Sequence, residues 1–286
     1  MQGWIYIVLS SACSVLIAHL LKTVEFRKIN TLRVLTVNYI TATAIAFYSA
    51  YDSFEVMSPG KISAGSIGLA LIVGIFFITN FFIYSKSVYR NGVGVSISAM
   101  RISLIIPVLL STVWYLELLD FRQWSGVFLV FIALFLLLPH KRSFLKKPFN
   151  ASWLLLLLFL CTGFGDASLK IFESEFKNIM AKETFMGMVF LAAMISGFVV
   201  ISIKKMWNFS GQEIFFGIVI GIPNLYSSIF LIDALLVMNG AVVYTVVNIL
   251  TVLGGTVLGL LRWGDVLTKA QWTGIFVTLL AIILLL

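Results

Sequence analysis

The segment Gln123-Trp124-Ser125-Gly126 returns as Gln271-Trp272-Thr273-Gly274, 148 residues further along the chain. Other residues agree at the same offset, and most are polar types that an apolar chain uses sparingly. They are Cys13 with Cys161, Lys22 with Lys170, Glu25 with Glu173, Asn30 with Asn178, Asn91-Gly92 with Asn239-Gly240, and the acidic pair Glu117 with Asp265. Agreement of Trp, Gln, Asn and Lys in one register predicts an internal duplication, with a first copy over residues 1–148 and a second over residues 149–286.

Composition places this chain in a membrane. Of its 286 residues, 60% are hydrophobic and 11% are charged, and the mean hydropathy is +1.06. Soluble domains carry about 25% charged residues, so this chain has more apolar surface than one water-facing domain can bury. We expect an all-α integral membrane protein, because a helix satisfies its own backbone hydrogen bonds in lipid.

Ten apolar runs come close to the roughly 20 residues that a membrane span needs. The first is read as an uncleaved helix, since no basic residue precedes it and no A-x-A site follows. The expected spans are Gly3–Leu21, Val34–Tyr51, Ala64–Tyr84, Gly94–Leu116, Trp124–Pro139, Ser152–Leu169, Thr184–Ile203, Gln212–Ile232, Asn239–Leu261 and Ala270–Leu286, of which the fifth and tenth are short. Five spans per copy is an odd number, so the two copies enter the membrane from opposite sides. The sequence therefore predicts two inverted five-helix repeats, an arrangement typical of transporters.

These features resemble the drug/metabolite transporter superfamily, and within it the ten-helix EamA-type members. Each copy in that family ends with an acidic residue, a polar turn and a last helix that opens with Gly. The corresponding segments here are Glu117-Leu-Leu-Asp-Phe-Arg-Gln-Trp-Ser-Gly126 and Asp265-Val-Leu-Thr-Lys-Ala-Gln-Trp-Thr-Gly274. Lys22 and Lys170, after the first helix of each copy, and Arg33, at the start of the second helix, also look like the family.

The resemblance covers nearly the whole chain, with some departures. Leu118 and Val266 follow the two acids, where the family usually has Pro or Arg-Leu. Pro107 lies about one turn nearer the acid than the family's proline, and Gly255 replaces it in the second copy. The resemblance implies proton-driven or gradient-driven movement, or exchange, of a small organic molecule through a central cavity. It also implies a bacterial inner membrane.

The ionisable residues that stand out inside the expected spans are His19, Arg101 and Asp166. A charge in hydrocarbon costs at least about 2.5–3.5 kcal/mol on insertion scales, so such groups usually face the bundle or a wet cavity. The planar guanidinium of Arg101 fits a carboxylate, which predicts either an anchor for an anionic solute or a structural pair with Asp166. Asp166 is a candidate for binding an ammonium group, carrying a coupling proton or pairing with Arg101. His19 is a candidate switch near neutral pH or a hydrogen-bonded structural residue.

Neutral polar residues form a second group of candidates, which either line a solute site or join helices by hydrogen bonds. They are Asn38, Asn80, Asn224, Tyr226, Tyr244 and Asn248. At about 1.5 Å per residue, Asn224 and Asn248 fall near the membrane midplane, where transporter sites concentrate. Pro223, directly before Asn224, is expected to free a carbonyl and bend its helix.

Glu117 and Asp265 stand at helix ends. They are predicted either to cap the fifth and tenth helices, where an acid suits the helix dipole, or to act as gates that close one side of each half. Two histidines and two cysteines, all far apart, cannot build a metal cluster or a disulfide framework, so no metal or cofactor is expected.

The positive charges leave the orientation open. The connections after odd-numbered helices hold 14 Lys and Arg residues and the remaining segments hold 5, with Arg101 left aside. The positive-inside rule then puts both termini outside, whereas the family resemblance implies that they lie inside. The net charge of +8 suits contact with anionic lipid headgroups and not with nucleic acid.

We therefore expect a secondary transporter of a small carboxylate-bearing solute, with export of an amino acid or related metabolite as the leading hypothesis. Uptake and exchange fit the family equally well, and protons are one candidate coupling ion. One alternative is a multidrug exporter of lipophilic cations, which Asp166 and 25 Phe favour and Arg101 disfavours. The other is a membrane enzyme acting on lipid-linked substrates, for which the loops offer no cluster of acids or histidines. The expected partners are the solute and membrane lipid, with the chain as a monomer or a homodimer.

Overall fold

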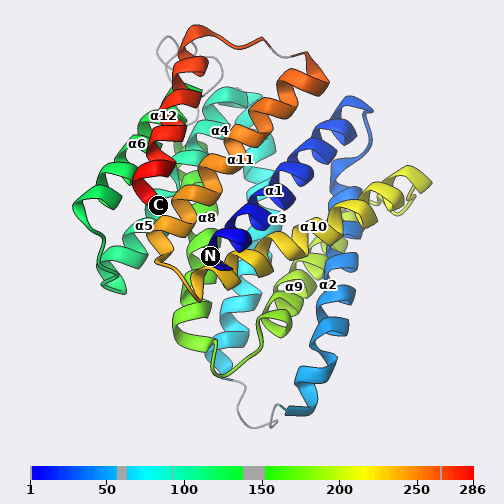
Figure 1. Ribbon diagram of the computed structural model, residues 1–286. Coiled ribbons are helices and arrows are strands. Elements are labelled where there is room, and N and C mark those ends of the chain that lie inside the picture. The colour runs from blue at the N-terminus through cyan, green and yellow to red at the C-terminus, as the bar shows by residue number, and fades with distance from the viewer. Residues whose placement is uncertain (1, 57–62, 92, 138–151, 265) are drawn as a thin grey trace.

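The computed structural model of this chain describes residues 2–56, 63–91, 93–137, 152–264 and 266–286, and every regular element in these ranges is helical (Figure 1). The elements are α1 (Gln2–Phe26), α2 (Thr31–Val56), α3 (Ala64–Asn91), α4 (Val93–Ile102), α5 (Ile105–Leu109), the π-helical turn η1 (Leu110–Trp114), α6 (Phe121–Leu137), α8 (Ser152–Ile171), the π-helical turn η2 (Phe172–Phe176), α9 (Lys182–Ile203), α10 (Gly211–Leu235), α11 (Gly240–Trp263) and α12 (Lys269–Leu285). If α4, α5 and η1 are taken as one interrupted helix and α8 with η2 as another, the described ranges hold ten helical segments. The expected all-α architecture is confirmed, and each of the ten expected spans overlaps one segment.

The length and composition of these helices define a membrane protein. Within the described ranges, seven segments are long and apolar enough to cross a bilayer: α1, α3, α4 through η1, α8 with η2, α9, α10 and α11. The paired helices α6 and α12 are apolar but shorter, as the sequence predicts. The chain is therefore an integral multi-pass membrane protein.

Helix α2 is long but less apolar than its neighbours, because it keeps polar side chains inside the bundle. It packs against both α9 and α10. Thr36, Asn38 and Thr43 are buried in these contacts, and Thr36 and Thr43 donate their hydroxyls to carbonyls one turn back in α2. Internal hydrogen bonds of this kind let a helix carry polar residues without presenting them to lipid.

The fourth expected span is broken in the middle. Helix α4 ends at Ile102 and α5 begins at Ile105, so that Ser103 and Leu104 lie between them. Pro107 accounts for the break, because its ring clashes with the carbonyl four residues earlier, which belongs to Ser103. Helix α10, in contrast, continues without a break through Pro223.

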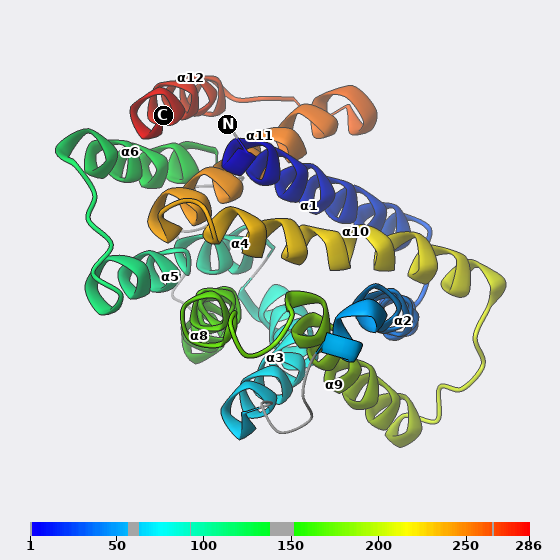
Figure 2. The ribbon, with the colours of Figure 1, turned by 60° about the horizontal axis from the view of Figure 1, so that its bottom comes forward.

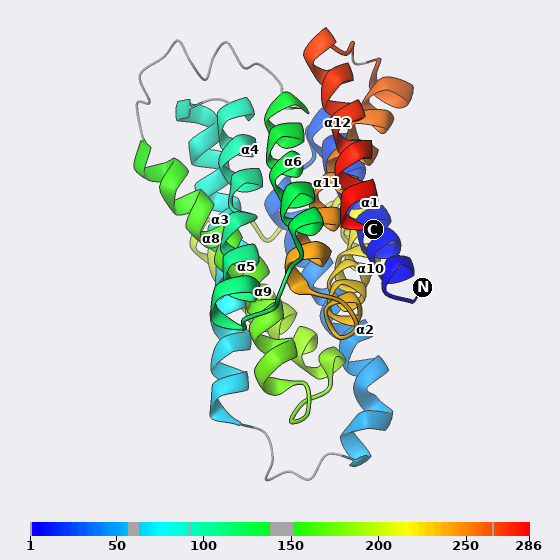
Figure 3. The same cartoon turned by 60° about the vertical axis from the view of Figure 1, so that its left-hand side comes forward.

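The helices are arranged in a bundle in which α10 packs between α1 and α2, and α9 packs between α2 and α3 (Figure 2). Helix α8 contacts α3, α4 and α5, and α11 contacts α1, α5 and α6. Helices α6 and α12 form a close pair at one side of the bundle (Figure 3). The helices α4, α8 and α11 thus meet in the interior, and the residues that they direct at one another make up the candidate site.

Close helix contacts at glycines predict which substitutions this bundle cannot accept. A Cβ at Gly74 of α3 would lie 2.6 Å from the Ala192 Cβ and 3.0 Å from the Ala193 backbone nitrogen of α9. We expect Gly74→Ala to separate the two helices and lower the free energy of unfolding by about 1–3 kcal/mol, measured as a lower melting temperature in detergent. Gly68→Ala on the same helix is the matched control, because no atom lies within 4 Å of its Cβ position. Equal melting temperatures for the two variants would contradict this packing.

Candidate functional site

Arg101 and Asn248 form the centre of the polar site. The Nη1 atom of Arg101 in α4 donates a hydrogen bond to Oδ1 of Asn248 in α11, over 3.1 Å. Each residue lies eight positions from the start of its helix, which is about 12 Å at 1.5 Å per residue. Both side chains are only half-buried in spite of this depth. Arg101 lies one residue before the end of α4, where the interrupted fourth span continues into α5, and its hydrogen bond to Asn248 indicates a polar contact between α4 and α11 inside the bundle.

Asp166 of α8 supplies the opposite charge. Its carboxylate interacts electrostatically with Arg101, yet among the described residues no acidic oxygen lies within 4.0 Å of the Arg101 guanidinium. Tyr244 of α11 joins α11 to α8, because its hydroxyl donates to the Asp166 backbone carbonyl over 2.8 Å. The structure therefore brings four predicted site residues to one junction of α4, α8 and α11, and holds the two charges near each other without a direct ion pair.

Asn80 extends this site along α3 and α8. It shares two hydrogen bonds with the Thr162 hydroxyl, at 3.1 and 3.3 Å. Thr162 lies one turn before Asp166 in α8, and Tyr84 lies one turn after Asn80 in α3. Tyr84 interacts electrostatically with Arg101. Sequence reasoning missed Thr162 and Tyr84, although the four-residue spacing from a candidate on the same helix could have indicated both.

Two predicted residues on α10 belong to other contacts. Nδ2 of Asn224 donates to Oδ1 of Asn38 in α2 over 3.1 Å, so this pair joins α10 to α2. Tyr226 stacks on Phe230, which in turn stacks on Tyr6 of α1, with ring centroids 5.8 and 6.4 Å apart. These contacts lie on helices that do not carry Arg101 or Asp166. Asn224 and Asn38 join two helices, whereas Tyr226 stacks on Phe230 of its own helix, and it is Phe230 that contacts α1.

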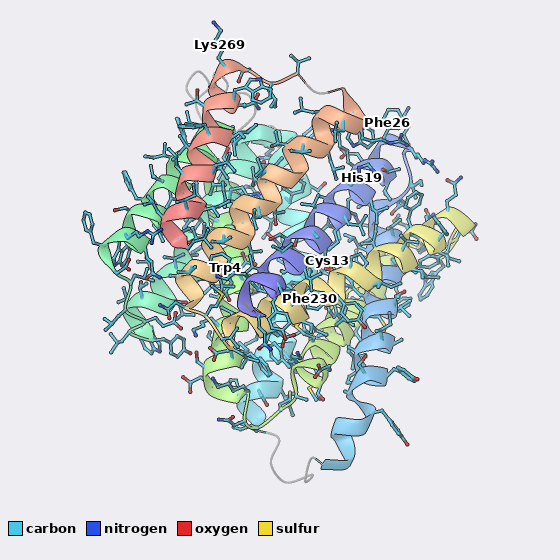
Figure 4. All side chains as sticks on the ribbon, in the orientation of Figure 1. Trp4, Cys13, His19, Phe26, Phe230 and Lys269 are labelled. Atoms are coloured by element: carbon cyan, nitrogen blue, oxygen red, sulfur yellow. The ribbon has the colours of Figure 1, made fainter. Side chains whose placement is uncertain are left out.

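His19 lies near the end of α1, far along the helix from Trp4 (Figure 4). Its Nδ1 accepts a hydrogen bond from the Trp263 indole over 3.3 Å, and Lys22 Nζ is 4.7 Å from the Trp263 ring centroid. A cavity of about 80 Å³ lies here between α1 and α11. His19 therefore belongs to a pocket at the end of the bundle and not to the Arg101 junction.

Glu117 occupies a helix N-terminus, but that of α11 instead of α6. Its Oε2 accepts the Gly240 amide over 2.7 Å, and its Oε1 is 2.6 Å from Lys170 Nζ. The cap of α6 is Asp120, whose carboxylate accepts the Gln123 amide over 2.6 Å. The sequence could not reveal this because α11 is more than 100 residues away in the chain. Asp265, its predicted counterpart, lies outside the described residues.

Among the described residues, no three His, Cys, Asp or Glu side chains gather where they could bind one ion. The site consists of one arginine, one aspartate and neutral hydrogen-bonding groups, which suits recognition of a polar molecule by hydrogen bonds and charge.

The helices and their polar junction define the class, a multi-pass membrane protein with a charged interior site. No protein-family model matches the chain. An uncharacterized protein of Haemophilus influenzae is 28% identical over 274 residues, which cover 94% of this chain and 93% of the relative. A crystal structure of a protein only 13% identical has a TM-score of 0.68 and matches over 99% of this chain and 95% of its own. The chain thus has a distant homologue in that bacterium and shares its fold with a solved structure.

The Arg101–Asn248 contact can be tested by a double-mutant cycle. Arg101→Met and Asn248→Leu should each lower the melting temperature in detergent, because each leaves a half-buried polar group inside the bundle without its hydrogen-bond partner. The double variant removes both groups and should lose less than the sum, with a coupling of about 1 kcal/mol. Strictly additive losses would mean that the two side chains do not interact.

Proposed function

We propose that this protein is a secondary transporter in which two inverted five-helix halves give alternating access to a site at Arg101. The solute is a small organic molecule with a carboxylate, and an amino acid is the leading candidate. The observation that carries the proposal is the Arg101 guanidinium, half-buried in the membrane interior, hydrogen-bonded to Asn248 and near the opposite charge of Asp166 without a direct ion pair.

Helix contacts support the repeat. When each helix is shifted by 148 residues, the contact of α1 with α10 corresponds to that of α8 with α3, and α10 with α2 corresponds to α3 with α9. Likewise, α1 with α11 corresponds to α8 with α4 and α5. The contacts of α2 with α9 and of α6 with α12 map onto themselves, as expected for elements on the axis that relates two halves.

Individual residues repeat in the same way. A Cβ at Gly126 of α6 would meet the Leu285 side chain, and one at Gly274 of α12 would meet Leu137, which is 148 residues before Leu285. Lys22 Nζ lies over the Trp263 ring at 4.7 Å, and its counterpart Lys170 lies over the Tyr115 ring at 5.6 Å. Two halves with equivalent contacts are able to exchange conformations, which is the physical basis of alternating access.

The charges at the junction support the choice of solute. A guanidinium offers parallel donors that match both oxygens of a carboxylate. Asp166 is close enough to Arg101 to interact with it electrostatically, and its carboxylate supplies a partner for an ammonium group or a proton. An α-amino acid carries both charges on one carbon, so it would satisfy Arg101 and Asp166 together and enter the membrane interior with no net charge. A lipophilic cation would meet the repulsion of Arg101.

Arg101→Gln tests the anchor. A thermal-shift screen of amino acids and other carboxylates first identifies a solute that stabilises the wild-type protein, and counterflow of that labelled solute into liposomes then measures transport without reference to a driving ion. Arg101→Gln should abolish both the stabilisation and the counterflow, because glutamine has no positive charge for the carboxylate. Recovery of unaltered solute separates transport from an enzymatic reaction.

Arg122→Gln is the matched control for lost charge. Arg122 is exposed and donates to the Ile283 carbonyl at the α6–α12 pair, away from the junction. The Arg122→Gln variant should retain counterflow. Saturable counterflow by Arg101→Gln at the wild-type rate would remove Arg101 from the solute site, and the absence of counterflow for every stabilising solute would contradict the transport proposal.

A further inference from the structure

A second charged cluster lies where α8 ends and α11 begins. Lys170 Nζ is 2.6 Å from Glu117 Oε1 and 2.6 Å from Glu173 Oε2. Only 5% of the Lys170 side chain and 6% of the Glu173 side chain are exposed. Because Glu117 also accepts the Gly240 amide, one buried lysine joins the connection before α6, the end of α8 and the start of α11.

Neighbouring contacts close the same end of the bundle. Asn239 Nδ2 donates to the Leu118 carbonyl over 3.1 Å. Ser111 of η1 is fully buried and packs against the start of α11, where a Cβ at Gly240 would lie 3.2 Å from the Ser111 Cβ. Two π-helical turns, η1 and η2, flank the cluster, and such turns are frequent at functional sites.

The opposite end of α11 carries related residues in a different setting. Lys22 and Trp263 stand 148 residues from Lys170 and Tyr115. Here a cavity of about 80 Å³ lies between α1 and α11, and Ala18, which lines it, is exposed. The same lysine–aromatic contact therefore occurs in a buried ion cluster at one end and beside a hollow at the other.

The hollow is aligned with the Arg101 junction. Its lining includes Gly255 and Gly259 of α11, which follow Asn248 by two and three helical turns on the same face. Glycines leave that face without side chains. Along α11 the structure thus has a hollow beside Gly255 and Gly259 and an ion-paired start, and a separate cavity of about 240 Å³ lies near that start between η2, the beginning of α9 and the end of α10.

We propose that the Glu117–Lys170–Glu173 cluster is a latch that holds shut the end of the bundle where α11 begins. The latch must break before a solute held at Arg101 leaves by that end, so this inference rests on the proposed transport function. A largely buried ion cluster is suited to the task, because breaking the Glu117–Lys170 contact removes one of the two carboxylates that compensate the lysine and leaves Glu173, which Lys177 also contacts, as its remaining partner. The latch therefore sets the balance between the two open states.

Two cysteine reporters test the latch in purified protein, without any solute. In a Cys13→Ser, Cys161→Ser background, Ser111→Cys reports on the latched end and Ala18→Cys on the hollow end, through their rates of reaction with a charged thiol reagent. Glu117→Gln should speed the reaction at position 111 by about tenfold or more. It should slow the reaction at position 18, because opening one end closes the other.

Asp120→Asn is the matched control. It removes an acid from the same connection, at the α6 N-terminus where asparagine also caps well, and should leave both rates unchanged. An unchanged rate at position 111 in Glu117→Gln overturns the latch. A faster rate there with no change at position 18 supports the latch and contradicts alternating access.

A loss of fold is recognised by a faster reaction at both positions. The double variant Glu117→Gln, Lys170→Gln removes both charges of this pair. If it also reacts faster at both positions, the cluster holds the fold and is not a latch. If the double variant reacts faster at position 111 alone or slower at position 18, the latch is supported.

Discussion

The requirement that every charge in the membrane interior be compensated governs this structure. The charge of Arg101 is compensated by the Asn248 oxygen and the more distant Asp166 carboxylate. The charge of Lys170 is compensated by two glutamates, Glu117 and Glu173. The first arrangement leaves room for hydrogen bonds from a solute, whereas the second is saturated. The incompletely paired arginine and the fully paired lysine therefore mark two different polar regions of the bundle, the candidate binding region and the proposed latch.

Both arrangements depend on contacts between helices from different halves of the chain. Arg101 and Glu117 lie before residue 149, while Asn248, Asp166 and Lys170 lie after it. A rotation of one half relative to the other would therefore alter the polar junction and the ion cluster together. Gly74 of α3 packs closely against Ala192 of α9, which also belong to different halves, so the same rotation would have to change this helix contact as well.

The sequence predicted the helices well because lipid imposes a long apolar run on every span. Sequence alone also singles out Arg101, Asn248, Asp166 and Tyr244, which the structure brings to one junction, since a charge inside a span has few places to face. The break before Pro107 follows from the steric effect of proline on the carbonyl four residues earlier, and the sequence reasoning passed over it. Glu117 was assigned to the wrong helix because its partners, Gly240 and Lys170, meet it only in the folded bundle. Tyr84 was read only as the end of a span, and its place beside Arg101 depends on how α3 packs against its neighbours.

The paired helices α6 and α12 are short in the described part of the chain. Helices α6 and α12 have 17 residues each, or about 26 Å at 1.5 Å per residue, against a hydrocarbon core of about 30 Å. The difference creates a hydrophobic mismatch beside this helix pair, which the lipids relieve by thinning locally at a modest free-energy cost per ångström. The length of the lipid acyl chains should therefore affect this protein unevenly around its circumference. The effect should be strongest beside the contact between α6 and α12.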